Sequence, residues 1–328
     1  MAEADQRLSR DARRSRRWGV LLAGGDGTRL RNLTRLVSGD DRPKQFCRLF
    51  GDESLLEQTQ KRAERSISPE QILVPLAMRH RAFYVQETAI RPSQRIVQPA
   101  NRGTAPPILY SVLSIEQIDN DGIIAVLPSD HHFSDDRAFT AALESAFEIA
   151  ARHPSAVVLL GASPQGPEVE YGWIELGPSV HGAGGVWSRV RGFFEKPSFQ
   201  AARELFARGS LWNTFVMVGH VRGFLEMLKV SLAYAVELLR GSQLWSGAEV
   251  HIQDALYDRI PAIDFSREVL SVQAPRLLAL RMANTGWSDL GHPERVMAVL
   301  QAARLEPWWM KKWRAPERDL ATKVALQV

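Results

Sequence analysis

Short apolar runs recur along the first half of the chain, and longer amphipathic segments separate them. Runs of this length are typical of buried strands, and they cover residues 18–23, 72–76, 95–97, 122–127 and 156–161. The segments between them predict helices over residues 54–66, 104–119 and 135–152. Strands that alternate with helices in this way predict a parallel, doubly wound sheet.

The local signals inside these helices agree with that interpretation. Ser54 and Glu57 have the spacing of a capping box, which marks a helix start. Pro106 and Pro107 fit best in the first turn of the helix over residues 104–119. In the helix over residues 135–152, one apolar stripe carries Phe139, Leu143, Ala146, Phe147 and Ala150.

The pattern changes after about residue 165. Strands are predicted over residues 171–176, 186–194, 215–218 and 276–282, with helices over residues 199–207, 221–240 and 292–303. We therefore predict an α/β fold: a Rossmann-like, doubly wound sheet that is mostly parallel but mixed. Its second half is elaborated for a substrate and is not an independent domain. The expected organisation is a flexible basic tail over 1–17, one domain over 18–300 and a basic-aromatic extension over 301–328.

Composition narrows the class of protein. Hydrophobic residues make up 45% and charged residues 24%, which is usual for globular proteins and argues against a disordered or fibrous chain. No apolar run reaches the roughly 18–20 residues needed to span a bilayer, so we expect no stable membrane insertion. Cys47 is the single cysteine, which excludes an internal disulfide and a zinc site with several thiolates. A cytoplasmic protein is expected.

The net charge of +4 is concentrated near the N-terminus, where residues 1–17 carry six arginines and three acidic residues. The rest of the chain is close to neutral, so we do not expect its folded part to bind nucleic acids. The same segment lacks an apolar core, so no secretory signal is expected. The basic, aromatic stretch over 308–314 could lie on a membrane surface. Packing of its tryptophans onto the body or a neighbouring subunit is favoured, which leaves a homodimer open.

A glycine-rich segment over residues 24–30 follows the first predicted strand. Glycines at a strand end let the backbone approach an anion closely, and Arg29 adds a forked cation suited to phosphate oxygens. The segment lacks the Gly-Lys-Ser/Thr of a Walker loop, and Leu30 stands where a dinucleotide fingerprint needs glycine. A plain tight turn is the alternative. Further on, Lys44 follows Pro43 and could place a point charge on a polyphosphate, although a solvated turn has the same sequence pattern.

These motifs, together with the stretch over 54–59, resemble the sugar-1-phosphate nucleotidylyltransferases, and within them the mannose-1-phosphate guanylyltransferase branch. The similarity continues in order from about residue 18 to 300. Its later segments are residues 98–106, 127–131, 170–174, 194–197, 211–213 and 287–291.

The resemblance implies that a nucleoside triphosphate, GTP above all, reacts with a hexose 1-phosphate, mannose 1-phosphate above all. An oxygen of the sugar phosphate attacks the α-phosphorus in line, which yields the nucleotide sugar and pyrophosphate. Positioning and charge neutralisation then carry the rate, as in other phosphoryl transfers. The positive charges that neutralise the two anionic substrates would come from Arg29, Lys44, Lys196 and a divalent metal ion. Mg²⁺ is the expected ion, because it prefers oxygen ligands.

The resemblance also assigns roles to individual residues. Catalysis falls to Arg29, Lys44 and Asp130, and metal binding falls to Asp130 and Asp289. The nucleotide-binding half, residues 18–165, would bind through Gly24, Gly25, Gly27, Thr28, Arg29, Lys44, Gln98, Asn101, Gly103 and Thr104. The sugar-phosphate-binding half, residues 166–300, would bind through Tyr171, Gly172, Glu195, Lys196 and Asn213.

Ordinary structural roles are the alternatives to these functional assignments. Asp130 could cap a turn, and Asp289 could cap the helix near His292. Adjacent histidines at 131 and 132 point in opposite directions along a strand, and no further cluster has ligand spacing, so we expect no zinc site.

Four places depart from the family pattern. Asp26 replaces a common serine, and residues 36–42 lengthen the link before Pro43, which affects the expected placement of Lys44. Residues 101–103 read Asn-Arg-Gly instead of Gly-Arg-Asn, and residues 214–216 read Thr-Phe-Val instead of Ser-Gly-Met. They motivate an alternative: a catalytically weak or silent relative that binds nucleotide or sugar phosphate in a regulatory role. An NAD-dependent oxidoreductase and a peripheral membrane or nucleic-acid module are weaker alternatives. Longer relatives carry an isomerase domain, and we expect no isomerase activity from this chain.

Overall fold

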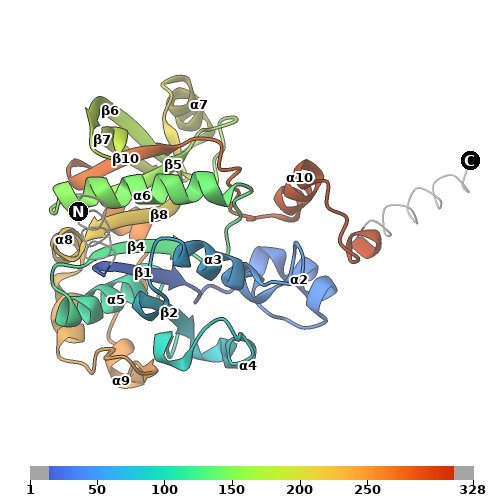
Figure 1. Ribbon diagram of the computed structural model, residues 1–328, viewed down its shortest axis with the longest axis horizontal. Coiled ribbons are helices and arrows are strands. Elements are labelled where there is room, and N and C mark those ends of the chain that lie inside the picture. Colours follow the sequence, from blue (N-terminus) through green and yellow to red (C-terminus); the bar gives the residue numbers. More distant parts are fainter. Residues whose placement is uncertain (1–14, 314–328) are drawn as a thin grey trace, which may run out of the picture.

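A mixed sheet runs through the centre of the molecule, with helices on both of its faces (Figure 1). The structure is a computed structural model that describes residues 15–313. The strands are β1 (Arg17–Leu22), β2 (Ile72–Ala77), β3 (Arg95–Gln98), β4 (Ile123–Pro128), β5 (Val157–Ala162), β6 (Gly172–Gly182), β7 (Gly185–Glu195), β8 (Leu211–His220), β9 (Val250–His251) and β10 (Leu277–Met282). The α-helices are α2 (Arg31–Ser38), α3 (Leu55–Glu64), α4 (Arg81–Tyr84), α5 (Ala105–Ile118), α6 (Asp136–Arg152), α7 (Phe199–Ala207), α8 (Val221–Arg240), α9 (Asp254–Tyr257) and α10 (Pro293–Ala303).

The strand order of the sheet is β5-β10-β7-β6-β8-β4-β1-β2-β3-β9. Strands β4, β1, β2, β3 and β9 pair in parallel, as the alternation of strands and helices predicted. β8 then runs antiparallel to both β4 and β5, and β5 pairs in parallel with β10. Because β6 also pairs with β8, the strands β5, β10, β7, β6 and β8 close into a ring. The predicted mixed α/β fold is confirmed.

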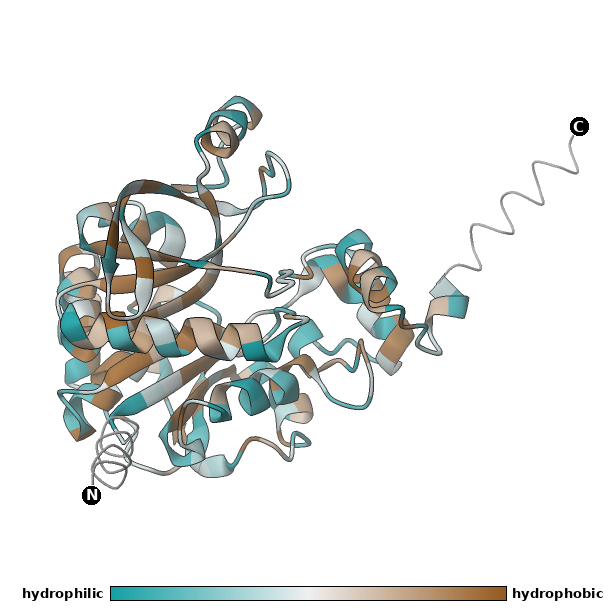
Figure 2. Cartoon of the chain, turned by 45° about the horizontal axis from the view of Figure 1, so that its top comes forward, coloured by the Kyte–Doolittle hydropathy of each residue, from teal (hydrophilic) through white to brown (hydrophobic). Residues whose placement is uncertain are grey.

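Alternate side chains of the central strands enter two different cores. On β4, Ile124 and Val126 face the core shared with α5 and α8, whereas Ala125 and Leu127 face the core shared with α3 and α6. This period of two explains why the predicted strands read as continuous apolar runs, since both faces are covered. Figure 2 shows the apolar strands inside and polar residues on the outer surfaces of the helices.

The predicted local signals are also confirmed. Ser54 and Glu57 form the capping box at the start of α3, and two prolines occupy the first turn of α5. The apolar stripe of α6 is buried along its whole length.

A third, smaller core joins the C-terminal region to the glycine-rich segment. α10 lies beside α2 at one end of the sheet (Figure 1). The buried members of this core are Leu30, Leu33, Cys47, Leu49, Leu55, Leu290, Val296, Leu300, Trp309 and Met310. Three distant segments, near residues 30, 47 and 290, therefore share one packing unit. Each of them adjoins a predicted site residue.

Several boundaries differ from the prediction. β1 begins at Arg17, whose guanidinium lies 2.8 Å from the Glu144 carboxylate, and Arg16 pairs with Asp121 at 3.2 Å. The end of the expected flexible tail, 1–17, therefore belongs to the folded body, and its first fourteen residues lie outside the described part. α2 was not predicted, because it is only eight residues long and its buried residues are Leu33 and Thr34 alone. β8 is longer than predicted, since its first half carries the irregular pairing around Gly161.

The predicted packing of the three C-terminal tryptophans is confirmed for two of them. Trp309 is fully buried and the half-buried Trp313 packs against the same small core, whereas Trp308 is 61% exposed. Residues 314–328 of the expected extension lie outside the described part. Among residues 15–313, no helix combines the length and apolarity that a membrane span requires.

Candidate functional site

Lys44 stands where three distant segments meet at the carboxyl end of the central strands. It begins a 3-10 turn, Lys44–Phe46, and it is almost fully buried. Its Nζ lies 3.2 Å from Asp130 Oδ2 and donates to the carbonyl oxygen of Asp289 at 2.6 Å. Asp130 follows β4 directly, at the edge of the sheet where open α/β folds bind ligands. The structure thus brings Lys44, Asp130 and Asp289 together.

The Asp289 carboxylate is held by several donors. Arg295 donates to both of its oxygens, at 2.8 and 2.9 Å, and the Tyr171 hydroxyl donates to Oδ1 at 3.1 Å. The amide of Gly291 adds a further bond at 3.0 Å. Burial tends to raise the pKa of Asp289, but positive neighbours that include Arg295 and Lys44 hold it below its usual value. The group is therefore an anion at neutral pH.

The donor set around Lys44 suits a hard cation such as Mg²⁺ in part. Asp130 is partly exposed; its cationic neighbour is Lys44, and His131 Nε2 lies 3.8 Å from its Oδ1. Asp289 Oδ2 accepts a single bond, from Arg295, and so keeps acceptor capacity. Within residues 15–313, no group of three or more acidic, histidine or cysteine side chains converges as a metal site. Two carboxylates fit Mg²⁺ when substrate phosphates and water supply its other ligands.

The two adjacent histidines face different neighbours, as predicted. Trp287 Nε1 donates to His131 Nδ1 at 3.2 Å, whereas the His132 ring packs against Phe50 with a centroid separation of 4.8 Å. Burial lowers the pKa of His131, and burial lowers the pKa of His132 to about 4. Both rings are therefore neutral near pH 7.

The glycine-rich loop is tied to the Lys44 turn by Gln45. Its amide nitrogen donates to the carbonyls of Ala23 and Gly25 at 2.9 and 2.8 Å. Gly27 has a φ of 58°, and a Cβ there would lie 3.1 Å from the Lys44 amide nitrogen. A side chain at this position would therefore be strained and crowded. The loop and Lys44 form one fixed unit, with Thr28 and Arg29 starting the next turn.

The two charged residues of the loop point to different partners. Asp26 pairs with Arg79, which compensates its negative charge, and His80 Nε2 lies 3.1 Å from the same carboxylate. Arg29 instead points to the second half of the chain, where its guanidinium lies 3.6 Å from Glu170 and 3.2 Å from His292. A cation of the glycine-rich loop thus contacts the segment that leads to Tyr171 and Gly172.

Four of the predicted nucleotide-binding residues, Gln98, Asn101, Gly103 and Thr104, lie between the end of β3 and the start of α5. Gln98 accepts from the buried Tyr257 hydroxyl at 2.5 Å, and a Cβ on Gly24 would lie 2.9 Å from its amide nitrogen. Gly103 has a φ of 81°, and a Cβ there would overlap the carbonyl of Ile263. Both neighbouring polar side chains accept backbone hydrogen bonds. Asn101 Oδ1 accepts from the nearby Gly103 amide at 2.9 Å, and Thr104 Oγ1 accepts from the amide of Phe265, far away in sequence, at 2.8 Å.

The predicted sugar-proximal residues form a second group. A Cβ on Gly172 would lie 2.8 Å from Glu195 Oε2 and 3.3 Å from Asn213 Cβ, so these three positions face one another. Burial raises the pKa of Glu195, although Lys196 lies 3.8 Å away. Lys196 itself has a φ of 49°, a strained conformation for a side-chain-bearing residue.

Tyr171 departs from this group. Its hydroxyl bonds Asp289 and its ring lies under the Arg295 guanidinium, 4.3 Å from it. The side chain therefore supports the Asp289 carboxylate, while Gly172 alone of the pair faces Glu195.

Sequence reasoning gave no role to Gln45, Tyr257 or Arg295. Gln45 lay inside a quoted motif and could have been found there. A cation in the first turn of a helix opposes the helix dipole, so Arg295 at the start of α10 was a usable signal that a carboxylate holds it. For Tyr257, no signal in the sequence was available.

Fold and site together define an α/β protein with a strained glycine loop and paired carboxylates at the carboxyl ends of its strands. The family model described as nucleotidyl transferase matches residues 18–304, and the chain belongs to this family. The resemblance inferred from the motifs is thereby confirmed.

Individual relatives agree. The chain is 30% identical over 284 residues to xanthan biosynthesis protein XanB of Xanthomonas campestris pv. campestris (strain B100), covering 83% of this chain and 57% of that protein. It is 34% identical over 292 residues to mannose-1-phosphate guanylyltransferase RfbM of Salmonella typhimurium (strain LT2), covering 83% and 56%. The chain thus spans little more than half the length of these curated relatives.

A solved structure is similar over most of both chains. The crystal structure of mannose-1-phosphate geranyltransferase from Thermus thermophilus aligns with a TM-score of 0.73 and 31% identity. The alignment covers 86% of this chain and 79% of that one.

Proposed function

We propose that the chain transfers a nucleotidyl group from a nucleoside triphosphate to a hexose 1-phosphate, releasing pyrophosphate. GTP and mannose 1-phosphate are the proposed substrates, and GDP-mannose is the product. Family membership and the similarity to a mannose-1-phosphate guanylyltransferase support this assignment. The observation that carries it is the junction at Lys44, where one cation lies between two carboxylate-bearing segments.

The nucleotide-binding half would hold the triphosphate against the glycine loop. Backbone amides of residues 24–28 approach the phosphates, and Arg29 leaves Glu170 to pair with them, since phosphate accepts both arms of a guanidinium. Lys44 neutralises the leaving pyrophosphate. Gln98 and the segment that includes Asn101, Gly103 and Thr104 lie where the base would stack, at the carboxyl end of β3.

The sugar-binding half would orient the second substrate. Glu195 and Asn213 can accept and donate hydrogen bonds to sugar hydroxyls, and Gly172 lets the backbone approach both side chains closely. Lys196 supplies a cation for the sugar phosphate. Holding both reactants with the attacking oxygen in line with the leaving group would account for most of the rate, because the protein forms no covalent bond.

Asp130 and Asp289 would hold the metal ion in this scheme. Bound Mg²⁺ would supply charge neutralisation for the phosphates that meet there. The role of this chain's own residues is to fix the two carboxylates: Lys44 contacts the segments of both, and Arg295 and Tyr171 orient Asp289. Lys44 and the loop glycines would then contact the same phosphates.

The alternative of a silent, regulatory relative loses part of its support. It rested partly on Asp26, whose negative charge would repel phosphates. In the structure, the Arg79 guanidinium compensates that charge, and His80 Nε2 lies 3.1 Å from the same carboxylate.

A substrate matrix tests the proposal. GTP, ATP, CTP and UTP are each combined with mannose, glucose and galactose 1-phosphates, and pyrophosphate release is followed with Mg²⁺ present. The proposal expects the fastest release with GTP and mannose 1-phosphate. Faster release with another pair would reassign the base or the sugar. Binding of GTP without turnover in any combination would support the silent relative instead.

A further inference from the structure

Arg295 is the residue that fixes Asp289, and none of the motif segments contains it. It lies in the first turn of α10, and its side chain is 18% exposed. One arm of the guanidinium donates to both oxygens of Asp289, at 2.8 and 2.9 Å. The other arm donates to Glu168 at 2.8 Å and to Glu170 at 3.2 Å.

The guanidinium is fixed on every side. Its plane lies over the Tyr171 ring at 4.3 Å, and the hydroxyl of the same tyrosine donates to Asp289. Arginine and carboxylate are therefore held by one another and by a shared aromatic partner. A planar fork of this kind determines the direction in which a carboxylate points, which a lysine cannot do.

The docking of α10 rests on other side chains. The helix is attached through the small core that contains Val296, Leu300 and Trp309, and Arg295 is no member of that core. Arg295 lies instead at the boundary between the helix and Asp289. Its loss would therefore leave the helix packing in place and act mainly on the carboxylate.

Charge at the site is largely compensated before any metal ion arrives. Four carboxylates, those of Asp130, Asp289, Glu168 and Glu170, are paired with three cations, Lys44, Arg295 and Arg29. A cation that approaches Asp289 must compete with the Arg295 guanidinium for the carboxylate oxygens. Phosphates that draw Arg29 and Lys44 toward themselves would shift this balance in favour of the metal ion.

We propose that Arg295 is a positioning residue that aims the Asp289 carboxylate and suppresses cation binding to it until the nucleotide phosphates are present. The inference rests on the proposed function, because it takes Asp289 as a metal ligand of the nucleotidyl transfer. It implies that the metal ion enters with the nucleotide and is not resident in the free protein.

The test compares Arg295→Gln and Arg295→Lys with the wild type. The matched control is Arg222→Gln, which removes an exposed arginine from the first turn of α8, where it pairs with Glu226. Mn²⁺ is the probe, and its binding to the nucleotide-free protein is measured by electron paramagnetic resonance. Turnover and KM for GTP are measured separately, together with the melting temperature.

We expect Arg295→Gln to bind Mn²⁺ about tenfold more tightly than the wild type, while kcat falls about 10- to 100-fold, since misplaced groups cost rate of this size. KM for GTP should stay within about threefold. Arg295→Lys should keep Mn²⁺ binding weak, because the charge remains, yet restore only part of kcat, because the fork is lost. Arg222→Gln should change none of these quantities.

Three results would overturn the inference. One is Mn²⁺ binding and kcat that both match the wild type in Arg295→Gln. Another is weaker Mn²⁺ binding with a proportional loss of folded protein, which would show a merely structural role. The third is full rescue of kcat by lysine.

Adding Asp289→Asn to Arg295→Gln should abolish the tightening of Mn²⁺ binding. Persistence of the tightening would also overturn the inference, because it would place the released site elsewhere. The Mn²⁺ measurement needs no turnover, so it gives an answer even if the substrate matrix shows no reaction and the proposed function fails.

Discussion

The Lys44 ammonium and the Asp130 carboxylate form an ion pair in which Nζ lies 3.2 Å from Oδ2. The same nitrogen donates to the carbonyl of Asp289 at 2.6 Å, so one side chain joins the turn after α2, the end of β4 and the loop before α10. Two of these three segments also contribute Cys47 and Leu290 to the small core that includes Trp309. Packing in this small core, away from the site itself, therefore helps to hold Lys44 in position.

The glycine loop offers a matched pair of substitutions. Gly27 and Gly39 both have left-handed φ angles, of 58° and 79°, so alanine at either should cost about 1–2 kcal/mol of stability. Only at Gly27 would the new Cβ approach Lys44, since nothing lies within 4 Å of a Cβ at Gly39. We expect Gly27→Ala to lose turnover and Gly39→Ala to retain it. Urea unfolding and steady-state kinetics measure the two effects, and equal turnover in both variants would contradict the crowding argument.

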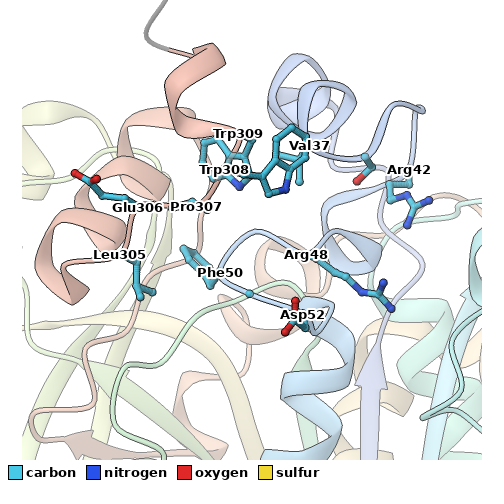
Figure 3. A pocket seen from close by; sticks show the side chains of 12 residues that line it. Val37, Arg42, Arg48, Phe50, Asp52, Leu305, Glu306, Pro307, Trp308 and Trp309 are labelled. Atoms are coloured by element: carbon cyan, nitrogen blue, oxygen red, sulfur yellow. The ribbon is translucent and has the colours of Figure 1, made fainter.

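The two neighbouring tryptophans of the C-terminal segment should behave differently. Figure 3 shows Trp308 and Trp309 beside Val37 of α2. Trp309 is fully buried and its Nε1 donates to the Leu49 carbonyl at 3.3 Å, whereas Trp308 is 61% exposed. Trp309→Ala should destabilise the protein by about 3–5 kcal/mol. Trp308→Ala should change stability by less than about 0.5 kcal/mol. A loss of turnover in Trp309→Ala below its melting temperature would further show that this core supports Lys44.

Glu87 predicts a pH-dependent gain of stability. Burial raises the pKa of Glu87, even though the Ser54 hydroxyl donates to its carboxylate at 2.7 Å. A carboxyl group whose pKa is higher in the folded state destabilises the fold at neutral pH, where it is ionised, and ceases to do so once it is protonated in both states. Glu87→Gln should therefore be more stable than the wild type at pH 7, and the difference should vanish as the pH falls through about 4.3.

Glu70→Gln serves as the control for this effect. A backbone hydrogen bond and Arg91 lower the pKa of Glu70, so glutamine should bring no gain there at pH 7. Urea unfolding at a series of pH values measures the free energy of unfolding of both variants and of the wild type. A Glu87→Gln gain that is the same at pH 7 and pH 4 would rule out the ionisation as its cause.

The two aspartates should act as one unit. Asp130→Asn and Asp289→Asn keep the side-chain shape and remove the charge, so each should lose about 10²–10³ in turnover. If they serve one metal centre, the double variant should be little slower than either single variant. Asp121→Asn, which removes a surface carboxylate paired with Arg16, should leave turnover unchanged. Losses that multiply in the double variant would mean that the two carboxylates act separately.

Removal of the metal ion gives a related outcome. We expect EDTA to abolish turnover of the wild type and added Mg²⁺ to restore it. Undiminished turnover in EDTA would remove the metal ion from the scheme.

Local patterns in the sequence predicted the fold well because its central strands are buried on both faces. The apolar runs of β1, β4 and β5 could be recognised without long-range information, as could the capping box at Ser54. α2 escaped prediction because its buried face consists of little more than Leu33 and Thr34. Its contribution to the fold comes from packing against α10, which lies far away in sequence.

The sequence predicted those residues of the candidate site that lie inside recognisable motifs. The motifs indicated Lys44, Asp130 and Asp289, but the resemblance gave no account of what holds them in place. Gln45 and Arg295 act through contacts made only after folding, so the sequence could indicate that they matter but not which partners they hold. Tyr171 was predicted near the sugar, whereas its side chain turns to Asp289, because residues 171 and 172 point in opposite directions.

Formation of GDP-mannose from GTP and mannose 1-phosphate, followed by chromatography, tests the central claim most directly when Lys44→Met is compared with the wild type. Methionine keeps the apolar stem and removes the charge. Lys61→Met, at an exposed lysine paired with Glu53, is the matched control. The account predicts product from the wild type and the control at similar rates, and about 10²–10³-fold less from Lys44→Met. Equal rates in all three proteins would contradict a site organised around Lys44.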